Sequence, residues 1–161
     1  MKVAIIQLSD IHLKSEKDFV ITHREAFYRS CKHIINECSN LIIVITGDIA
    51  FKGAKEEYDL AKRWLNNCVK SWEREAIFLN KIDYVIVPGN HDCDFSGSQT
   101  IREAIKQSIL NKDLLEEKEL ADLCLSIQNN FWNFYGDLIG AEMTPKISIS
   151  KTIQLKLDYS I

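Results

Sequence analysis

The stretch YVIVPGNHDCDF, residues 84–95, joins an apolar segment directly to a short polar one. Residues 83–88, DYVIVP, have the β-branched content of a buried strand, and Gly89-Asn90-His91-Asp92 follow at once. Taken alone, these four residues could form an ordinary polar turn, since Gly and Asn favour turns and Asp often caps the next helix. The rest of the chain decides between such a turn and a functional site.

Two further apolar segments precede this stretch, and each is followed by a helical pattern. Residues 3–9 (VAIIQLS) and 41–46 (LIIVIT) have the pattern of buried strands, whereas residues 23–38 and 54–78 carry apolar side chains at helical spacing. Strand, helix, strand, helix, strand is the order of a parallel α/β sheet with right-handed crossovers. We therefore predict an α/β fold built on this sheet.

The chain continues with a mainly helical region and ends with an alternating one. Apolar residues recur at helical spacing within 99–110 and 117–135, so we expect a helical insertion at about 97–145 that either caps the site or covers one face of the sheet. Farther on, apolar and polar residues alternate up to Ile161, which predicts half-buried, antiparallel strands. Because the alternation is still running there, we expect residues 1–161 to be the N-terminal part of one longer domain.

Composition limits the class of protein. A chain of 161 residues with 46% hydrophobic and 27% charged residues suits a single globular domain. A net charge of -3, without a long Lys/Arg block, argues weakly against binding nucleic acid by charge alone. We expect neither a signal peptide nor a membrane span, and hence no membrane partner. Five cysteines without a C-x-x-C pair indicate reduced thiols in the cytoplasm, while the sequence leaves the oligomeric state undetermined.

Polar residues follow each of the three predicted strands. The strands end in Ser9-Asp10-Ile11-His12, in Thr46-Gly47-Asp48 and in Gly89-Asn90-His91-Asp92. Binding sites in parallel α/β sheets lie at the carboxyl ends of the strands, so we expect the three clusters to converge on one rim. Gly47 and Gly89 allow the chain to turn sharply there and to bring its backbone close to a ligand.

The residue types in these clusters suit a metal site. Asp10 and His12 are two residues apart, so on an extended chain both side chains point the same way and can bind one ion. Asp48 can bridge two ions with its two oxygens, and Asn90 offers a neutral amide oxygen. Carboxylate, imidazole and amide ligands together suit Mn, Fe or Zn, and suit Mg less well because an imidazole is present.

The blocks D-x-H, G-D and G-N-H-D, in this order and each ending a predicted strand, resemble the N-terminal half of the calcineurin-like metallophosphoesterases. The resemblance implies a four-layer α/β/β/α sandwich with a two-metal centre. It implies that Asp10 and His12 bind one metal, that Asp48 bridges the two metals and that Asn90 binds the second.

The same resemblance makes His91 a catalytic residue near the leaving-group oxygen, and we expect Asp92 to support the loop. In such a centre, two metals about 3.5–4 Å apart bind a bridging hydroxide, which attacks the phosphorus. A histidine with a pKa near neutrality suits protonation of the leaving oxygen. The expected function is therefore hydrolysis of a phosphodiester, in a nucleotide or a nucleic acid, with two divalent ions. Manganese is the favoured metal, and Fe, Zn and Mg are alternatives.

Departures from the family pattern narrow the substrate class. Protein phosphatases of this superfamily usually carry G-D-x-V-D-R-G and R-G-N-H-E. Here Phe51 and Lys52 stand in place of the Asp and Arg of the first block, and Pro88 and Asp92 replace the Arg and Glu of the second. We therefore expect a phosphodiesterase or nuclease rather than a phosphoprotein phosphatase.

The number of histidines leaves two hypotheses open. The family pattern needs further histidines downstream, but His91 is the last of four, and His23 and His33 lie in the first helical region, where surface or packing roles are expected. In the first hypothesis, the missing ligands lie beyond this chain, and the isolated fragment is inactive. In the alternative, the chain is a degenerate, non-catalytic binding module, and its helical face with Trp64 and Trp72 marks a partner surface.

Overall fold

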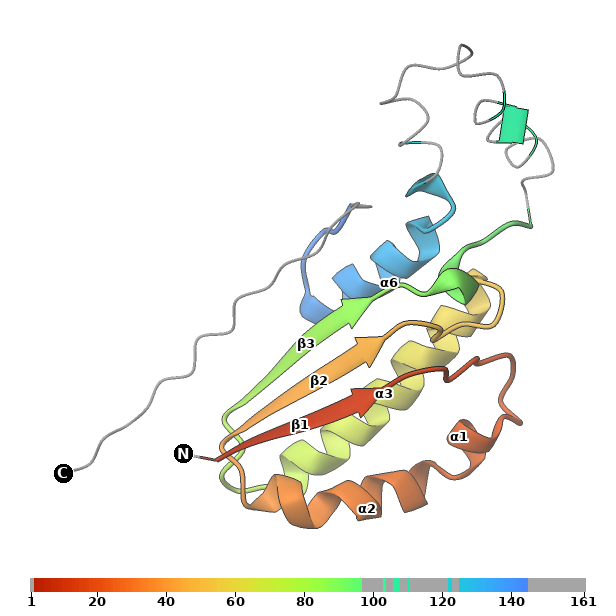
Figure 1. Ribbon diagram of the computed structural model, residues 1–161. Helices are drawn as coiled ribbons and strands as arrows, with labels where there is room; N and C mark the ends of the chain where they lie inside the picture. Colours follow the sequence, from red (N-terminus) through yellow and green to blue (C-terminus); the bar gives the residue numbers. More distant parts are fainter. Residues whose placement is uncertain are drawn as a thin grey trace.

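The computed structural model describes residues 2–96 and 125–144, together with the single positions 103, 106, 107, 110 and 122. Three strands, β1 (Val3–Leu8), β2 (Asn40–Thr46) and β3 (Lys81–Val87), form one parallel sheet in the order β1-β2-β3. Figure 1 shows the three strands side by side and pointing the same way. The predicted parallel sheet is therefore confirmed.

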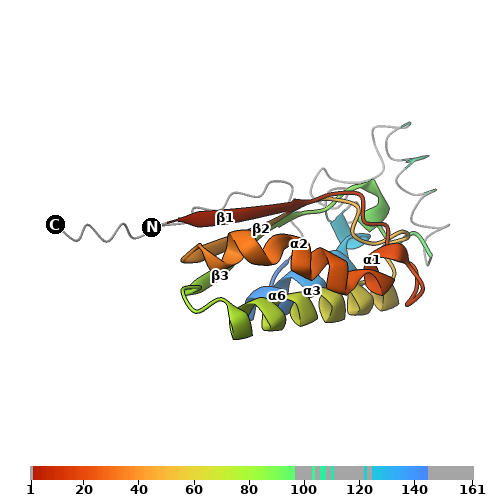
Figure 2. The ribbon, with the colours of Figure 1, turned by 90° about the horizontal axis from the view of Figure 1, so that it is seen from below.

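The helices lie on one face of this sheet (Figure 2). Two helices, α1 (Phe19–Thr22) and α2 (Arg24–Asn36), connect β1 to β2, and α3 (Lys55–Glu75) connects β2 to β3. Right-handed crossovers that advance in one direction across a sheet place their helices on the same face. A further helix, α6 (Asn129–Ile139), packs against α3 and β3 and extends this layer.

The helix predicted within 117–135 differs from the observed one. A turn at 127–128 precedes α6, which then continues to Ile139. The carbonyl of Ile127 accepts a hydrogen bond of 2.7 Å from the main-chain N–H of Asp94, so the loop after β3 uses an acceptor that a continuous helix would need. Most of the predicted insertion at 97–145, and the alternating segment after it, lie outside the described residues.

The core lies between the sheet and the helical layer. Alternate residues of β2 are buried, and they belong to the same core cluster as the buried residues of α3. On α3, Trp64 and Trp72 are only 3% and 2% exposed. The ring of Phe27, from α2, lies with its centroid 5.3 Å from that of Trp64 and 5.9 Å from that of Trp72. The hypothesis that these two tryptophans form a partner surface is therefore wrong, because α2 covers them.

The opposite face of the sheet has no helix against it within the described ranges (Figure 2). Ile5, whose side chain alternates to that face, is 66% exposed. The described residues thus contain one helical layer and one sheet of the expected sandwich. No helix in this part of the chain combines the length and the apolar character needed to cross a membrane.

Candidate metal centre

The parallel strands end at the same edge of the sheet (Figure 1), and the backbone pairing of the first two continues past their ends. The N–H of His12 donates to the carbonyl of Asp48 at 2.9 Å, and the N–H of Leu13 donates to the carbonyl of Ile49 at 2.9 Å. This continued pairing places Asp10 and His12 directly beside Asp48.

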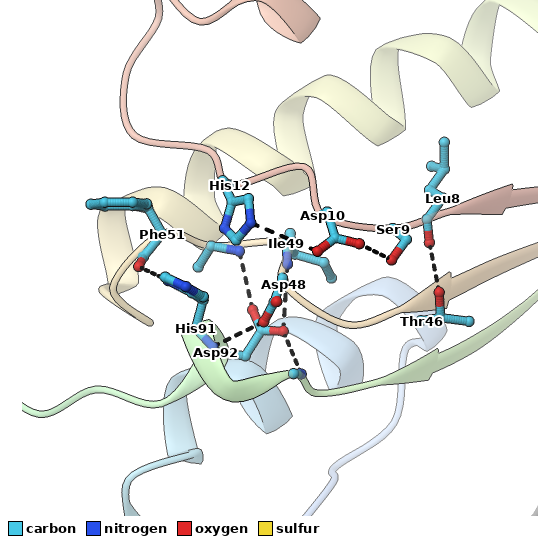
Figure 3. A network of polar contacts seen from close by, with 12 residues as sticks. Leu8, Ser9, Asp10, His12, Thr46, Asp48, Ile49, Phe51, His91 and Asp92 are labelled. Atoms are coloured by element: carbon cyan, nitrogen blue, oxygen red, sulfur yellow. Dashed lines mark hydrogen bonds and ion pairs between the residues drawn. The ribbon is translucent and has the colours of Figure 1, made fainter.

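The ligand atoms of Asp10, His12 and Asp48 all lie within 4.8 Å of one another (Figure 3). Nε2 of His12 is 3.9 Å from Oδ1 of Asp10, which is too far for a hydrogen bond. Two ligands that each lie about 2.0–2.2 Å from one ion are separated by at most about 4.4 Å, and the 3.9 Å between these two atoms meets this limit. Nδ1 of His12 is buried and has no hydrogen-bond partner within the described residues. Two carboxylates and an imidazole at this spacing fit a divalent metal ion.

The backbone at these three residues is left-handed. Asp10, His12 and Asp48 have φ values of 54°, 50° and 54°, and no other non-glycine residue in the described part of the chain has a positive φ. Asp and His enter this region more readily than most residues, but such conformations still cost about 1–3 kcal/mol each. The extended backbone predicted for Asp10 and His12 is therefore wrong. Their side chains converge because the chain turns at both residues.

The loop after β3 joins the cluster through Asp48. Its Oδ1 atom accepts a hydrogen bond of 2.9 Å from the main-chain N–H of His91. A Cβ atom on Gly47, which has a φ of 101°, would lie 2.9 Å from Cα of Gly89, so the two loops touch through glycine backbone. Asn90 opens the short 3-10 helix η1 (Asn90–Asp92) and is exposed. The structure thus brings all three predicted clusters together.

Replacing Gly89 by alanine is expected to displace the Asp48 carboxylate. Gly89 has a φ of −102°, which any residue accepts, but its Cβ would lie 2.1 Å from Asp48 Oδ1. Crowding of this kind typically costs about 1–3 kcal/mol, and a loss of about 1.4 kcal/mol in binding is tenfold in affinity. We therefore expect the metal affinity of the full-length protein, measured by titration calorimetry, to fall about tenfold.

A matched control separates crowding from loss of stability. Gly140 has a φ of 67°, and a Cβ there would meet no atom within 4 Å. Gly140→Ala should therefore lower the melting temperature through backbone strain and leave metal affinity unchanged. Wild-type metal affinity in Gly89→Ala would show that the contact with Asp48 has no role in metal binding.

His91 is held by a main-chain acceptor. Its Nδ1 atom lies 2.8 Å from the carbonyl oxygen of Phe51. A carbonyl can only accept, so Nδ1 carries the proton of the neutral ring, and Nε2 is the nitrogen left for chemistry. The imidazole rings of His91 and His12 are 4.5 Å apart between centroids, and the Phe51 ring stacks on His91 at 5.6 Å. The His91 ring therefore lies directly beside the ligand cluster.

Asp92 is completely buried and ties the second loop to the third (Figure 3). Its carboxylate accepts main-chain N–H bonds from Ile49, Ala50 and Gly89 at 3.4, 3.1 and 2.9 Å. The hydroxyl of Tyr58 donates a fourth bond at 2.9 Å. Burial and the Asp92 charge raise the pKa of Tyr58, so this phenol stays a donor. Together these bonds offset the cost of burying the carboxylate.

Sequence reasoning missed Glu57 and Tyr58, which lie in the first turn of α3. The Glu57 carboxylate accepts N–H bonds from Phe51, Lys52 and Ala54 at 3.1, 2.8 and 3.2 Å. A glutamate at the third helical position commonly reaches back to the residue before the helix, and this spacing was a usable signal. No sequence pattern predicts the two further bonds, which Glu57 accepts from the N–H groups of Phe51 and Lys52.

A parallel α/β sheet with two carboxylates and an imidazole at its strand ends is typical of a metal-binding enzyme. The chain matches the family model of the calcineurin-like phosphoesterases over residues 3–159, and it belongs to this family.

Two curated relatives were found that resemble this chain. YydB of Bacillus subtilis (strain 168), an uncharacterized metallophosphoesterase-like protein, is 28% identical over 145 residues, which cover 88% of this chain and 29% of YydB. GpdQ of Arcobacter nitrofigilis, a probable glycerophosphodiester phosphodiesterase, is 30% identical over 92 residues, covering 55% of this chain and 29% of GpdQ. The chain thus spans less than a third of the length of these relatives. No solved structure matches it.

Proposed function

We propose that this chain is part of a metal-dependent phosphodiesterase. The observation that carries the proposal is the convergence of Asp10, His12 and Asp48, all on left-handed backbone, at the end of a parallel sheet. Strained backbone persists where the surrounding structure holds a functional geometry. The likeness to a probable glycerophosphodiester phosphodiesterase supports a diester substrate, as do Phe51 and Lys52, which depart from the protein-phosphatase pattern.

In this proposal the ligands are those expected from the family. Asp10 and His12 would hold one ion, Asn90 would hold a second, and Asp48 would contribute an oxygen to each. We propose Mn²⁺, because mixed carboxylate, imidazole and amide donors suit it, with Fe, Zn or Mg as alternatives. When bound, the ions lower the pKa of water and offset the charge of the phosphoryl oxygens. Four side chains are too few for two ions, so we propose that the remaining ligands come from elsewhere in the full-length protein.

His91 supplies the proton that the leaving oxygen needs. Because Nδ1–H is directed to the carbonyl of Phe51, the proton that moves is the one on Nε2 of the charged ring. The Nζ atom of Lys14 lies 3.6 Å from the centroid of the Phe51 ring, and that ring stacks on His91, so this rim of the site carries a lysine. A negatively charged diester, of a nucleotide or a nucleic acid, is attracted to such a rim.

Metal removal tests the proposal. Full-length protein stripped by a chelator is expected to hydrolyse bis-p-nitrophenyl phosphate only after Mn²⁺ is added back. The monoester p-nitrophenyl phosphate serves as control and should react more slowly, because we propose a diesterase. A cyclic nucleotide, single-stranded DNA and a glycerophosphodiester, assayed in parallel, distinguish the possible substrate classes. Diesterase activity that survives complete metal removal would rule the mechanism out.

The cysteines support a reducing compartment, and we propose the cytoplasm. Cys31, Cys38, Cys68 and Cys93 are free thiols. Burial raises the pKa of Cys68 to about 12 and also raises the pKa of Cys93, so both stay protonated near neutral pH and are poor metal ligands. A disulfide between any two of them, in protein isolated without reductant, would contradict this location.

A further inference from the structure

We infer that Glu57 is a positioning residue for His91, acting through the peptide group between Phe51 and Lys52; the inference rests on the proposed function of the site. Glu57 is only 7% exposed, although it is charged. Its three hydrogen bonds all end on one oxygen, Oε2, and all come from main-chain N–H groups of residues 51–54. Such a carboxylate fixes the loop that leads away from Asp48.

Capping of α3 does not account for this arrangement. The bond from Ala54, the residue before the helix, is the one that a helix cap requires. Phe51 and Lys52 precede the helix by several residues, so their bonds to Glu57 add nothing to the helix itself. What these bonds restrain is the orientation of the loop peptides.

The restrained peptide carries the acceptor for His91. The N–H of Lys52 and the carbonyl of Phe51 belong to the same planar peptide group, and they point to opposite sides of the chain. Glu57 accepts a hydrogen bond of 2.8 Å from this N–H. On the other side of the peptide, the Phe51 carbonyl accepts from Nδ1 of His91 at 2.8 Å, as Figure 3 shows. The N–H of Phe51 is also held, by Glu57 and by the carbonyl of Leu13 at 3.2 Å. The Glu57 carboxylate therefore fixes the direction of the Phe51 carbonyl, and this carbonyl orients the His91 ring.

This connection decides which nitrogen of His91 is available for proton transfer. A carbonyl aimed at Nδ1 selects the Nδ1–H tautomer and leaves Nε2 free. A carboxylate on the N–H side of the same peptide also polarises the carbonyl and strengthens its bond to the histidine. Without Glu57 the N–H of Lys52 loses its acceptor, and the carbonyl of Phe51 is held less firmly toward the His91 ring.

The first test measures the tautomer without using activity. Glu57→Ala removes the acceptor, whereas Glu57→Gln keeps one oxygen where all three donors meet. In metal-free full-length protein, the ring ¹⁵N shifts of His91 should report the Nδ1–H tautomer in wild type and Glu57→Gln, and a mixture in Glu57→Ala. Glu56→Ala, in the same helical turn but exposed, is the matched control and should resemble wild type. If Glu57→Ala is unstable, Glu57→Asp provides a second variant. Its side chain is one methylene shorter, so the carboxylate no longer reaches the three N–H groups, and His91 should again show a mixture of tautomers.

The second test uses leaving groups of increasing basicity. Methyl aryl phosphates that release 4-nitrophenol, 3-nitrophenol or phenol need increasing help from a proton donor. With Mn²⁺, we expect the loss of kcat in Glu57→Ala to grow from less than about threefold to about 10²-fold across this series, within the range of a general acid. Glu57→Gln should follow wild type throughout, which is rescue by the conservative variant.

Two results would overturn the inference. One is a pure Nδ1–H tautomer in Glu57→Ala and Glu57→Asp, and the other is an equal loss of rate with every leaving group, as expected for general damage to the fold. Failure of the proposed function is distinguishable from both. If the wild-type protein shows no metal-dependent diesterase activity, the ring-nitrogen measurement still decides whether Glu57 controls His91.

Discussion

Replacing Asp48 by asparagine is expected to remove bound metal and diester turnover from the full-length protein together. Asn keeps the size of the side chain and an oxygen that can accept the N–H of His91, so the loops should stay in place. It lacks the negative charge and offers one oxygen instead of two, so it cannot bridge two ions. Loss of an outer-sphere partner typically costs 10–100-fold in metal affinity, and for this proposed direct ligand we expect at least about 100-fold.

Metal stoichiometry after dialysis and kcat/KM with bis-p-nitrophenyl phosphate measure the two effects. Asp59→Asn is the matched control, because Asp59 is an exposed carboxylate on α3 with the same change in charge. This control should keep both metal and activity. Full metal content in Asp48→Asn would remove Asp48 from the proposed ligand set.

Replacing His91 by alanine should have the opposite signature. Metal content is expected to stay nearly intact, while the rate falls by about 10²–10⁴-fold, the usual contribution of a general acid. The reason is structural. The side chain of His91 bonds to the carbonyl of Phe51, and its main-chain N–H, which alanine retains, donates to Asp48.

His33→Ala provides the comparison for His91. The His33 side chain is 86% exposed on α2, so its removal should change neither metal content nor rate. An empty metal site in His91→Ala would show that His91 is a ligand and that its assignment to the leaving oxygen is wrong. Asp48 and His91 are thus separated by metal content as well as by turnover.

Local chemistry was enough to predict much of the fold. The apolar runs at 3–9, 41–46 and 83–88 predict β1, β2 and β3 to within about two residues, because each is rich in the β-branched and aliphatic residues that favour strands. The helical stripe at 54–78 likewise predicts α3. Period and composition are properties of neighbouring residues, so they can be read without any contact between distant ones.

The apolar stripe on α3 shows what a local sequence pattern does not predict. Its periodicity identifies Trp64 and Trp72 as one face of a helix, but does not say what that face meets. The answer depends on α2, which brings Phe27 against both rings. A face that is apolar in sequence becomes core or interface only through the packing of another element.

The sequence alone determined the class of this protein. Three short polar blocks, each placed after an apolar run, predict a metal site at one edge of a parallel sheet and resemble one family, to which the chain belongs. Residue types and their order carry that information, because Asp, His and Asn have the same ligand chemistry wherever the chain places them.

Only the tertiary structure decided how the site is held. Alternation along a strand predicts an extended Asp10-Ile11-His12, yet backbone pairing with the loop after β2 turns Asp10 and His12 into the left-handed region. Asp92 likewise accepts hydrogen bonds from four groups, and Glu57 orients the peptide between Phe51 and Lys52. These groups lie in loops and helices that no local pattern relates to one another. Such contacts join residues up to 43 positions apart, so their geometry exists only once the sheet has formed.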